Sequence, residues 1–164
     1  MKKMVTILSV LMVMFSLVGC TAPMSKEAAI NELKQKNTTM FTASNTYAGL
    51  APDGDYLHST SYEIMYDGTV NIKYSFSVSG DTYVSTTISD DDYAEIYFRS
   101  VKAAKENDFE NYYIDGFDGG IWTITFYDPD NSNPTQLLSG AVASGNETLD
   151  TYFSILKKLS DQAQ

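Results

Sequence analysis

The chain has 164 residues, with 11 Lys or Arg against 21 Asp or Glu, so its formal net charge is −10 at pH 7. This balance argues against nucleic acid as a partner, because proteins bind nucleic acid by neutralising its phosphates with cations. It also argues against broad electrostatic adhesion to an anionic lipid surface.

The first residues have the composition of a secretory signal. Lys2 and Lys3 supply a positive start, and an uncharged, mostly apolar run follows from Met4 to Val18. This run is shorter than the roughly 20 apolar residues that a membrane-spanning helix needs. The run ends at Leu17-Val18-Gly19-Cys20, which resembles the lipobox of bacterial lipoproteins.

The resemblance implies that a diacylglyceryl group is attached to the sulfur of Cys20 and that a peptidase cuts before this residue. Residues 1–19 would then be a signal peptide. The protein would be anchored to the cell membrane through lipid on Cys20, facing outside the cytoplasm. Since Cys20 is the only cysteine, lipidation would leave no thiol for a disulfide.

Residues 20–59 are expected to form the lipidated N-terminus and a tether, with a short helix over residues 26–36 capped by Ser25. Residues 37–61 are rich in Asn, Thr, Ser, Ala and Gly and include the turn signal Pro52-Asp53-Gly54. The folded domain is predicted to span residues 60–164.

Apolar and polar residues alternate from Ser61 to Ile88 and predict three antiparallel strands. The first two strands are joined at Asp67-Gly68, and the next turn is at Ser79-Gly80-Asp81. In the second strand, Asn71 and Lys73 lie on the face that is expected to be wet. Two further strands are predicted at Trp122–Phe126 and Gln136–Val142.

Helical spacing replaces the alternation in two segments. Ser89 is placed to cap the first helix, whose apolar stripe is Tyr93, Ile96, Tyr97, Val101 and Ala104. Ser144-Gly145-Asn146-Glu147 resembles a capping box that opens the second helix. The stripe of that helix is Leu149, Tyr152, Phe153, Leu156 and Leu159.

The element order predicts an α+β fold, an antiparallel meander sheet of about five strands with two amphipathic helices packed on one face. This order resembles small envelope modules such as PepSY-like and inhibitor-like domains. The likeness is one of element order and implies no activity.

The sequence contains few groups suited to catalysis. His58 is the only histidine, and no cysteine other than Cys20 could partner it, so no nucleophile and base are identified. The 21 acidic residues leave a carboxylate pair as the basis of an alternative, a small envelope hydrolase.

Metal binding is considered for the turn from Asp128 to Pro134, where Asp128, Asp130 and Ser132 alternate as in a calcium loop. The positions that hold Gly and the distal Glu in an EF-hand are occupied here by Asn133 and Ser139. A plain hairpin turn is therefore preferred and no cofactor is expected, with calcium kept as the alternative.

Aromatic residues in the loop at 111–120 are the candidate partner site. Tyr112, Tyr113 and Phe117 lie there among Gly and Asp, and exposed rings of this kind stack on sugars or contact proteins. Tyr47 and Tyr56 are weaker candidates, and packing against the core is the alternative for all of them. We expect a non-catalytic binding or accessory module whose partner is a protein or an envelope polymer.

Overall fold

The computed structural model describes residues 26–49, 52–106, 113–114, 120–130, 133–142 and 145–163. The chain divides into two units, residues 1–30 and residues 31–164. The described part of the first unit is the beginning of helix α2 (Lys26–Leu33), which lies where the short helix was expected.

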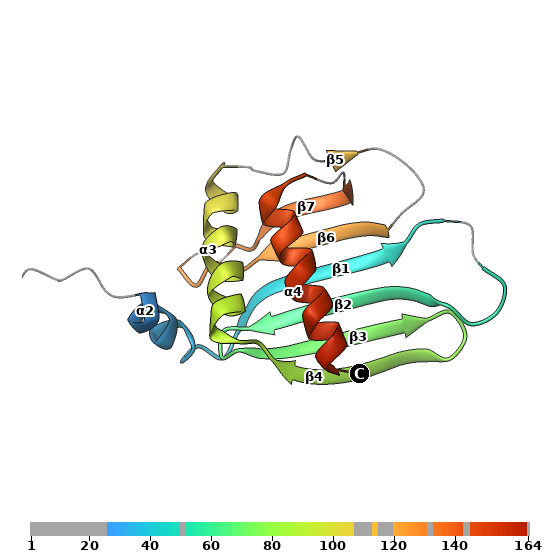
Figure 1. The fold of residues 1–164 in the computed structure, drawn as a ribbon, viewed down its shortest axis with the longest axis horizontal. Coiled ribbons are helices and arrows are strands. Elements are labelled where there is room, and N and C mark those ends of the chain that lie inside the picture. Colours follow the sequence, from blue (N-terminus) through green and yellow to red (C-terminus); the bar gives the residue numbers. More distant parts are fainter. Residues whose placement is uncertain are drawn as a thin grey trace, which may run out of the picture. The chain divides into compact units, whose positions relative to one another are not determined.

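The second unit is built on one antiparallel sheet. Its strands are β1 (Thr39–Tyr47), β2 (Leu57–Met65), β3 (Thr69–Phe76), β4 (Gly80–Thr87), β5 (Tyr113–Ile114), β6 (Gly120–Phe126) and β7 (Thr135–Val142). They lie in the order β4-β3-β2-β1-β6-β7-β5. The predicted α+β class is confirmed, with six full strands and the two-residue β5 in place of about five (Figure 1).

Glycine and aspartate fix the first predicted hairpin. The Asp67 carboxylate accepts a hydrogen bond of 2.8 Å from the Thr69 amide, and Gly68 adopts a φ of 90°. This φ lies in the left-handed region that glycine enters without a steric penalty. Gly80, at the start of β4, has a φ of 84° and closes the second hairpin in the same way.

One face of the sheet carries a continuous apolar row that crosses six strands. Cross-strand neighbours in this row are Val84, Ile72, Tyr62, Ala43, Ile124 and Leu138. All of them except the partly exposed Val84 are buried. Since side chains alternate between the faces of a strand, this row assigns the core to one side of the sheet.

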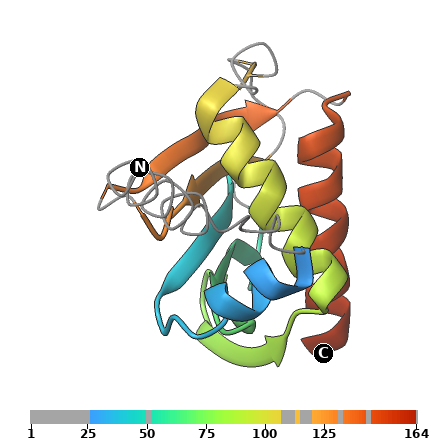
Figure 2. The same ribbon diagram turned by 90° about the vertical axis from the view of Figure 1, so that its left-hand side faces the viewer.

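Helices α3 (Asp90–Glu106) and α4 (Glu147–Ala163) cover this apolar face (Figures 1 and 2). Near the start of α4, the Phe153 ring lies 4.6 Å from the Trp122 ring of β6, measured between centroids. Near its end, the Ser160 hydroxyl is hydrogen-bonded to the Tyr62 hydroxyl of β2 at 2.6 Å. The helix therefore crosses the strands rather than following one of them.

Two predictions about the helices are corrected by the structure, the N-cap of α4 and the buried face of α3. The cap of α4 is Asn146, whose side-chain oxygen accepts a 3.0 Å hydrogen bond from the Leu149 amide, whereas Ser144 lies outside the described residues. In α3 the buried small residues are Ala94, Ser100 and Ala103, whereas Val101 and Ala104 of the predicted stripe are partly exposed. The cap predicted at Ser89 is confirmed, because its hydroxyl accepts from the Asp92 amide at 3.3 Å.

The expected tether over residues 20–59 is wrong from Thr39 onward. Strand β1 lies in the middle of the sheet, paired with β2 on one edge and β6 on the other. Its buried residues are only Met40, Phe41 and Ala43, and its other side chains are mostly polar. A strand with so few apolar positions looks like a linker in the sequence although it is central in the fold.

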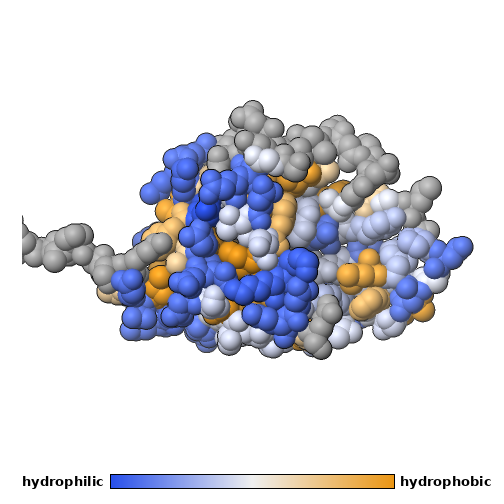
Figure 3. Space-filling model, viewed as in Figure 1, coloured by the Kyte–Doolittle hydropathy of each residue, from blue (hydrophilic) through white to orange (hydrophobic). Residues whose placement is uncertain are grey.

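Over α3 and α4 the surface is mostly hydrophilic, with hydrophobic areas between the helices (Figure 3). Within the described part of the chain, no helix combines the length and the apolar character that crossing a membrane would require.

Candidate functional site on the open face of the sheet

The face of the sheet opposite α3 and α4, called here the open face, carries two polar rows of cross-strand neighbours. The Tyr83 row consists of Tyr83, Lys73, Ser61, Ser44 and Thr123. The Glu63 row consists of Ser85, Asn71, Glu63, Thr42 and Thr125. Each row takes one residue from each of β4, β3, β2, β1 and β6. Side chains in such a row are direct neighbours, about 5 Å apart at Cβ.

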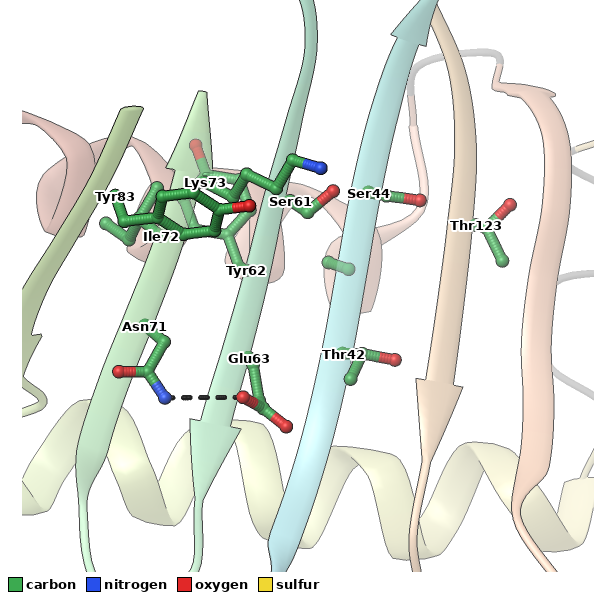
Figure 4. Close-up of a pocket in the computed structure, with 11 residues that line it drawn as sticks. Thr42, Ser44, Ser61, Tyr62, Glu63, Asn71, Ile72, Lys73, Tyr83 and Thr123 are labelled. Carbon is green, nitrogen blue, oxygen red and sulfur yellow. Dashed lines mark hydrogen bonds between the residues drawn. The ribbon is translucent and has the colours of Figure 1, made fainter. Parts of the chain in front are cut away.

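The two rows border a hollow of about 520 Å³. Most residues of both rows line it, and Ala43, Tyr62 and Ile72 contribute to its floor. Figure 4 shows Tyr83 and Lys73 together in the Tyr83 row, with Glu63 and Asn71 together in the Glu63 row. The volume lies within the range of about 300–1,000 Å³ that is usual for ligand sites.

Charge in the Tyr83 row is balanced by one ion pair. The Lys73 ammonium lies 2.8 Å from the Asp81 carboxylate and 5.9 Å from the centre of the Tyr83 ring. The hydrogen bond from Lys73 is the largest cause that holds the pKa of Asp81 below its ordinary value, and the same contact raises the pKa of Lys73. Both groups are therefore charged at neutral pH.

The Glu63 row is organised by the carboxylate of Glu63. This carboxylate accepts a hydrogen bond of 2.8 Å from the Thr39 hydroxyl. It accepts a second one of 3.3 Å from the Asn71 amide, which Figure 4 shows. The carbonyl oxygen of the Asn71 side chain accepts from the Ser85 hydroxyl at 2.9 Å. These bonds hold the carboxylate and the amide in defined positions, so a ligand would meet a preorganised polar edge.

The open face therefore combines fixed polar groups with an exposed ring. Tyr83 is 70 % exposed, which is unusual for so large a side chain. In the same two rows, the hydroxyls of Thr42, Ser44, Ser61 and Thr123 face the hollow and make no hydrogen bond among the described residues. The arrangement is suited to holding a polar ligand by side chains rather than by backbone groups.

The sequence predicts which residues of β3 lie on the open face, but it does not identify this face as a binding site. The alternation in β3 correctly assigns Asn71 and Lys73 to the wet side, and a wet side is ordinarily read as solvated surface. The two rows arise only when the strands are aligned, and the polar residues of β1 come from a segment that was read as a tether.

The loop predicted to bind a partner cannot be compared with this site. Tyr112 and Phe117 lie outside the described residues, and Tyr113 is described by its backbone alone, in β5 opposite Val142. The role of these three residues stays a prediction.

The structure brings together the other aromatic candidates and the lone histidine. The Tyr47 and Tyr56 rings meet edge to face with centroids 5.7 Å apart, and the Tyr56 and His58 rings lie 6.4 Å apart. Tyr47 is the last residue of β1 rather than a loop residue. His58 is exposed, and the ring contact with Tyr56 gives it no arrangement of a general base beside a nucleophile.

In the turn considered for calcium, Asp128 accepts a 3.0 Å hydrogen bond from the Asp130 amide, as expected of a plain turn. Asn131 and Ser132 lie outside the described residues. The described residues contain no group of three or more His, Cys, Asp or Glu placed to hold a metal ion.

A comparison with protein-family models finds none that matches this chain, and a comparison with curated proteins finds no match either.

Proposed function

We propose that this chain is a lipid-anchored, extracytoplasmic binding module that acts without catalysis and holds its partner on the open face. The observation that carries the proposal is the hollow of about 520 Å³ on a sheet face that α3 and α4 leave uncovered. A sheet face that only contacts water gains nothing from a hollow, from a carboxylate held by hydrogen bonds or from a tyrosine ring that is 70 % exposed. A binding surface uses all three.

The hydrolase alternative has less support from this site. Glycoside hydrolysis uses two carboxyl groups, about 5 to 9.5 Å apart, that flank the bond to be cleaved. Glu63 is the one carboxylate among the described residues that line the hollow, and it is already bonded to Thr39 and Asn71. Binding therefore uses the groups that are present, whereas hydrolysis requires a second one.

Membrane attachment is proposed from the lipobox, with the lipid on Cys20 as the anchor. Mass spectrometry of the membrane-extracted protein should find a lipid-modified Cys20 as the first residue. Cys20→Ser should move the protein out of the membrane fraction. An unmodified Cys20 in a processed chain would contradict the anchor.

Partner binding is tested with envelope material isolated from cells that lack the protein. Ser44 lies in the middle of the hollow, so Ser44→Arg should fill it and reduce retention on this material. Ser154→Arg is the matched control, because Ser154 is exposed on α4, away from the open face. Equal retention of the wild type and of both variants would refute the open face as the binding surface.

A further inference from the structure

The ligand class can be inferred from the chemistry of the hollow, and this step rests on the proposed function. The backbone groups in the floor of the hollow belong to strands paired on both sides in the ladders of β1, β2, β3 and β6. Side chains alone are therefore available to a ligand. This differs from a sheet edge, where an extended peptide is recognised through backbone hydrogen bonds.

The charges of the hollow favour an uncharged ligand. Among the described residues that line it, Lys73 is the one cation, and Asp81 neutralises this residue at 2.8 Å. Glu63 and the net charge of −10 repel anions, so phosphate-bearing and carboxylate-bearing ligands lack a counter-charge. A metal cation needs several oxygen ligands, and Glu63 is the one carboxylate among the described residues that line the hollow.

The polar groups are those that recognise hydroxyls. A carboxylate accepts hydrogen bonds, an amide both donates and accepts, and the hydroxyls of Thr42, Ser44, Ser61 and Thr123 can do either. The exposed Tyr83 ring adds a flat apolar surface, and the nearby Lys73 ammonium borders it. A ligand that matches both the polar side chains and the Tyr83 ring has many hydroxyls at its rim and an apolar face of C–H groups.

The shape of the site favours a chain of such units. The rows run from β4 to β6 across four strand spacings of about 4.8 Å, or roughly 19 Å in all. They are separated along the strands by two residues, about 6.7 Å. The area covered by the two rows is thus longer across the strands than along them.

We propose that the open face binds a neutral carbohydrate chain that lies across the strands between the two rows. One sugar ring stacks on Tyr83, and the hydroxyls of the following units bond to Glu63, Asn71 and the Ser and Thr side chains of β1 and β2. Both a free oligosaccharide and a polysaccharide of the envelope have this chemistry.

The test uses the full-length chain, purified in a detergent without a sugar headgroup because such a headgroup would compete. The chain is titrated with the hexamers of glucose and of N-acetylglucosamine, and hexagalacturonate is the anionic counterpart. At least one neutral hexamer should bind and shift the amide NMR signals of β1 to β4, whereas hexagalacturonate should not. Co-sedimentation with purified neutral cell-wall polysaccharide then distinguishes a polymer ligand from a free oligosaccharide.

The affinities of point variants for the hexamer show which side chains bind it. Tyr83→Ala should weaken the hexamer about tenfold or more, whereas Tyr83→Phe should stay within about twofold because stacking needs the ring and not its hydroxyl. Glu63→Gln should weaken binding several-fold through the lost charged acceptor. Val78→Ala is the control, since Val78 is an exposed apolar residue between β3 and β4 that does not line the hollow. Thermal unfolding verifies that each variant is folded.

Failure of this inference can be distinguished from failure of the proposed function. If no neutral hexamer or polysaccharide binds, or if Tyr83→Ala binds as the wild type does, the carbohydrate assignment is wrong. If Ser44→Arg still loses retention on envelope material in that case, the open face remains the binding surface and its partner is a protein. If Ser44→Arg is retained normally, both proposals fail.

Discussion

Between α3 and α4, one buried hydrogen bond joins two residues that are far apart in the chain. The Ser100 hydroxyl lies 2.8 Å from the Tyr152 hydroxyl, and neither residue is exposed to solvent. The Tyr152 ring also meets Phe41 of β1 edge to face, with centroids 5.1 Å apart. This residue thus links the two helices to the central strand.

Ser100→Ala should lower the free energy of unfolding by about 1–2 kcal/mol, because the Tyr152 hydroxyl loses a partner inside the core. Urea unfolding measures the loss, and the exposed Ser154→Ala serves as the control. A double-mutant cycle with Tyr152→Phe should give a coupling energy of about 1 kcal/mol. Strictly additive effects would mean that the two hydroxyls do not interact.

Asp92 connects the N-terminus of α3 with the C-terminal part of α4. Its carboxylate accepts hydrogen bonds from Ser89, at 2.7 Å, and from Lys158. Burial is the largest effect on Asp92 and raises its pKa, but the hydrogen bonds from Lys158 and Ser89 and the charge of Lys158 together outweigh it. The pKa of Asp92 therefore lies below its ordinary value.

The lowered pKa of Asp92 predicts that the folded protein loses stability in acid. A carboxyl whose pKa is lower in the folded state stabilises fully above its unfolded pKa of about 3.9, and this contribution is lost as pH falls through the folded pKa. Asp92→Asn should therefore cost up to about 1 kcal/mol at pH 7 and progressively less below about pH 4. Unfolding curves at pH 7, 5 and 3 measure this difference, with the exposed neighbour Asp91→Asn as the control. A gap that stays constant with pH would contradict the account.

At the scale of the secondary-structure elements, the N-terminus of α4 is fixed by one residue, Asn146. Asn146 bonds to the Leu149 amide through its side chain and to the Asp150 amide through its carbonyl oxygen, the latter at 2.9 Å. It is also buried. The first turn of the helix that covers the sheet therefore depends on this residue.

Asn146→Ala should destabilise the protein by about 1 kcal/mol through loss of the cap. Ser144→Ala replaces the cap that the sequence suggested and should change stability by less than about 0.5 kcal/mol. Thermal and urea unfolding measure both variants. The opposite ranking would restore Ser144 as the residue that starts the helix.

At the scale of the whole molecule, the N-terminal boundary of the folded domain differs between prediction and structure. The sequence predicts a start at residue 60, whereas the sheet already includes β1 from Thr39. A chain of residues 26–164 retains β1 and should unfold cooperatively. A chain of residues 60–164, the domain expected from the sequence, lacks the strand between β2 and β6 and should not. Circular dichroism during heating compares the two, and cooperative unfolding of the shorter chain would show that β1 is dispensable.

The fold was predictable where one face of an element is apolar along its whole length. Tyr62, Ile64 and Val70 mark the β2–β3 hairpin in this way, and Tyr152 and Leu156 mark α4. Strand β1 was not predictable, because its middle residues Ser44 and Asn45 carry no apolar signal and its position depends on pairing with distant strands. The open face was hidden for the same reason, since its rows combine single residues from five strands.

The central position of β1 has a consequence for the order of folding. Strands β1 to β4 follow one another in the chain and pair in that order, but the second edge of β1 pairs with β6, where Phe41 meets Phe126 and Thr42 meets Thr125. A chain that emerges N-terminus first can complete the four-stranded part early, yet it must leave β1 as an unpaired edge until residues 120–126 arrive. Closing so long a loop is entropically slow, and an exposed strand edge is a template for intermolecular pairing. The protein is therefore most prone to aggregation while it is being made.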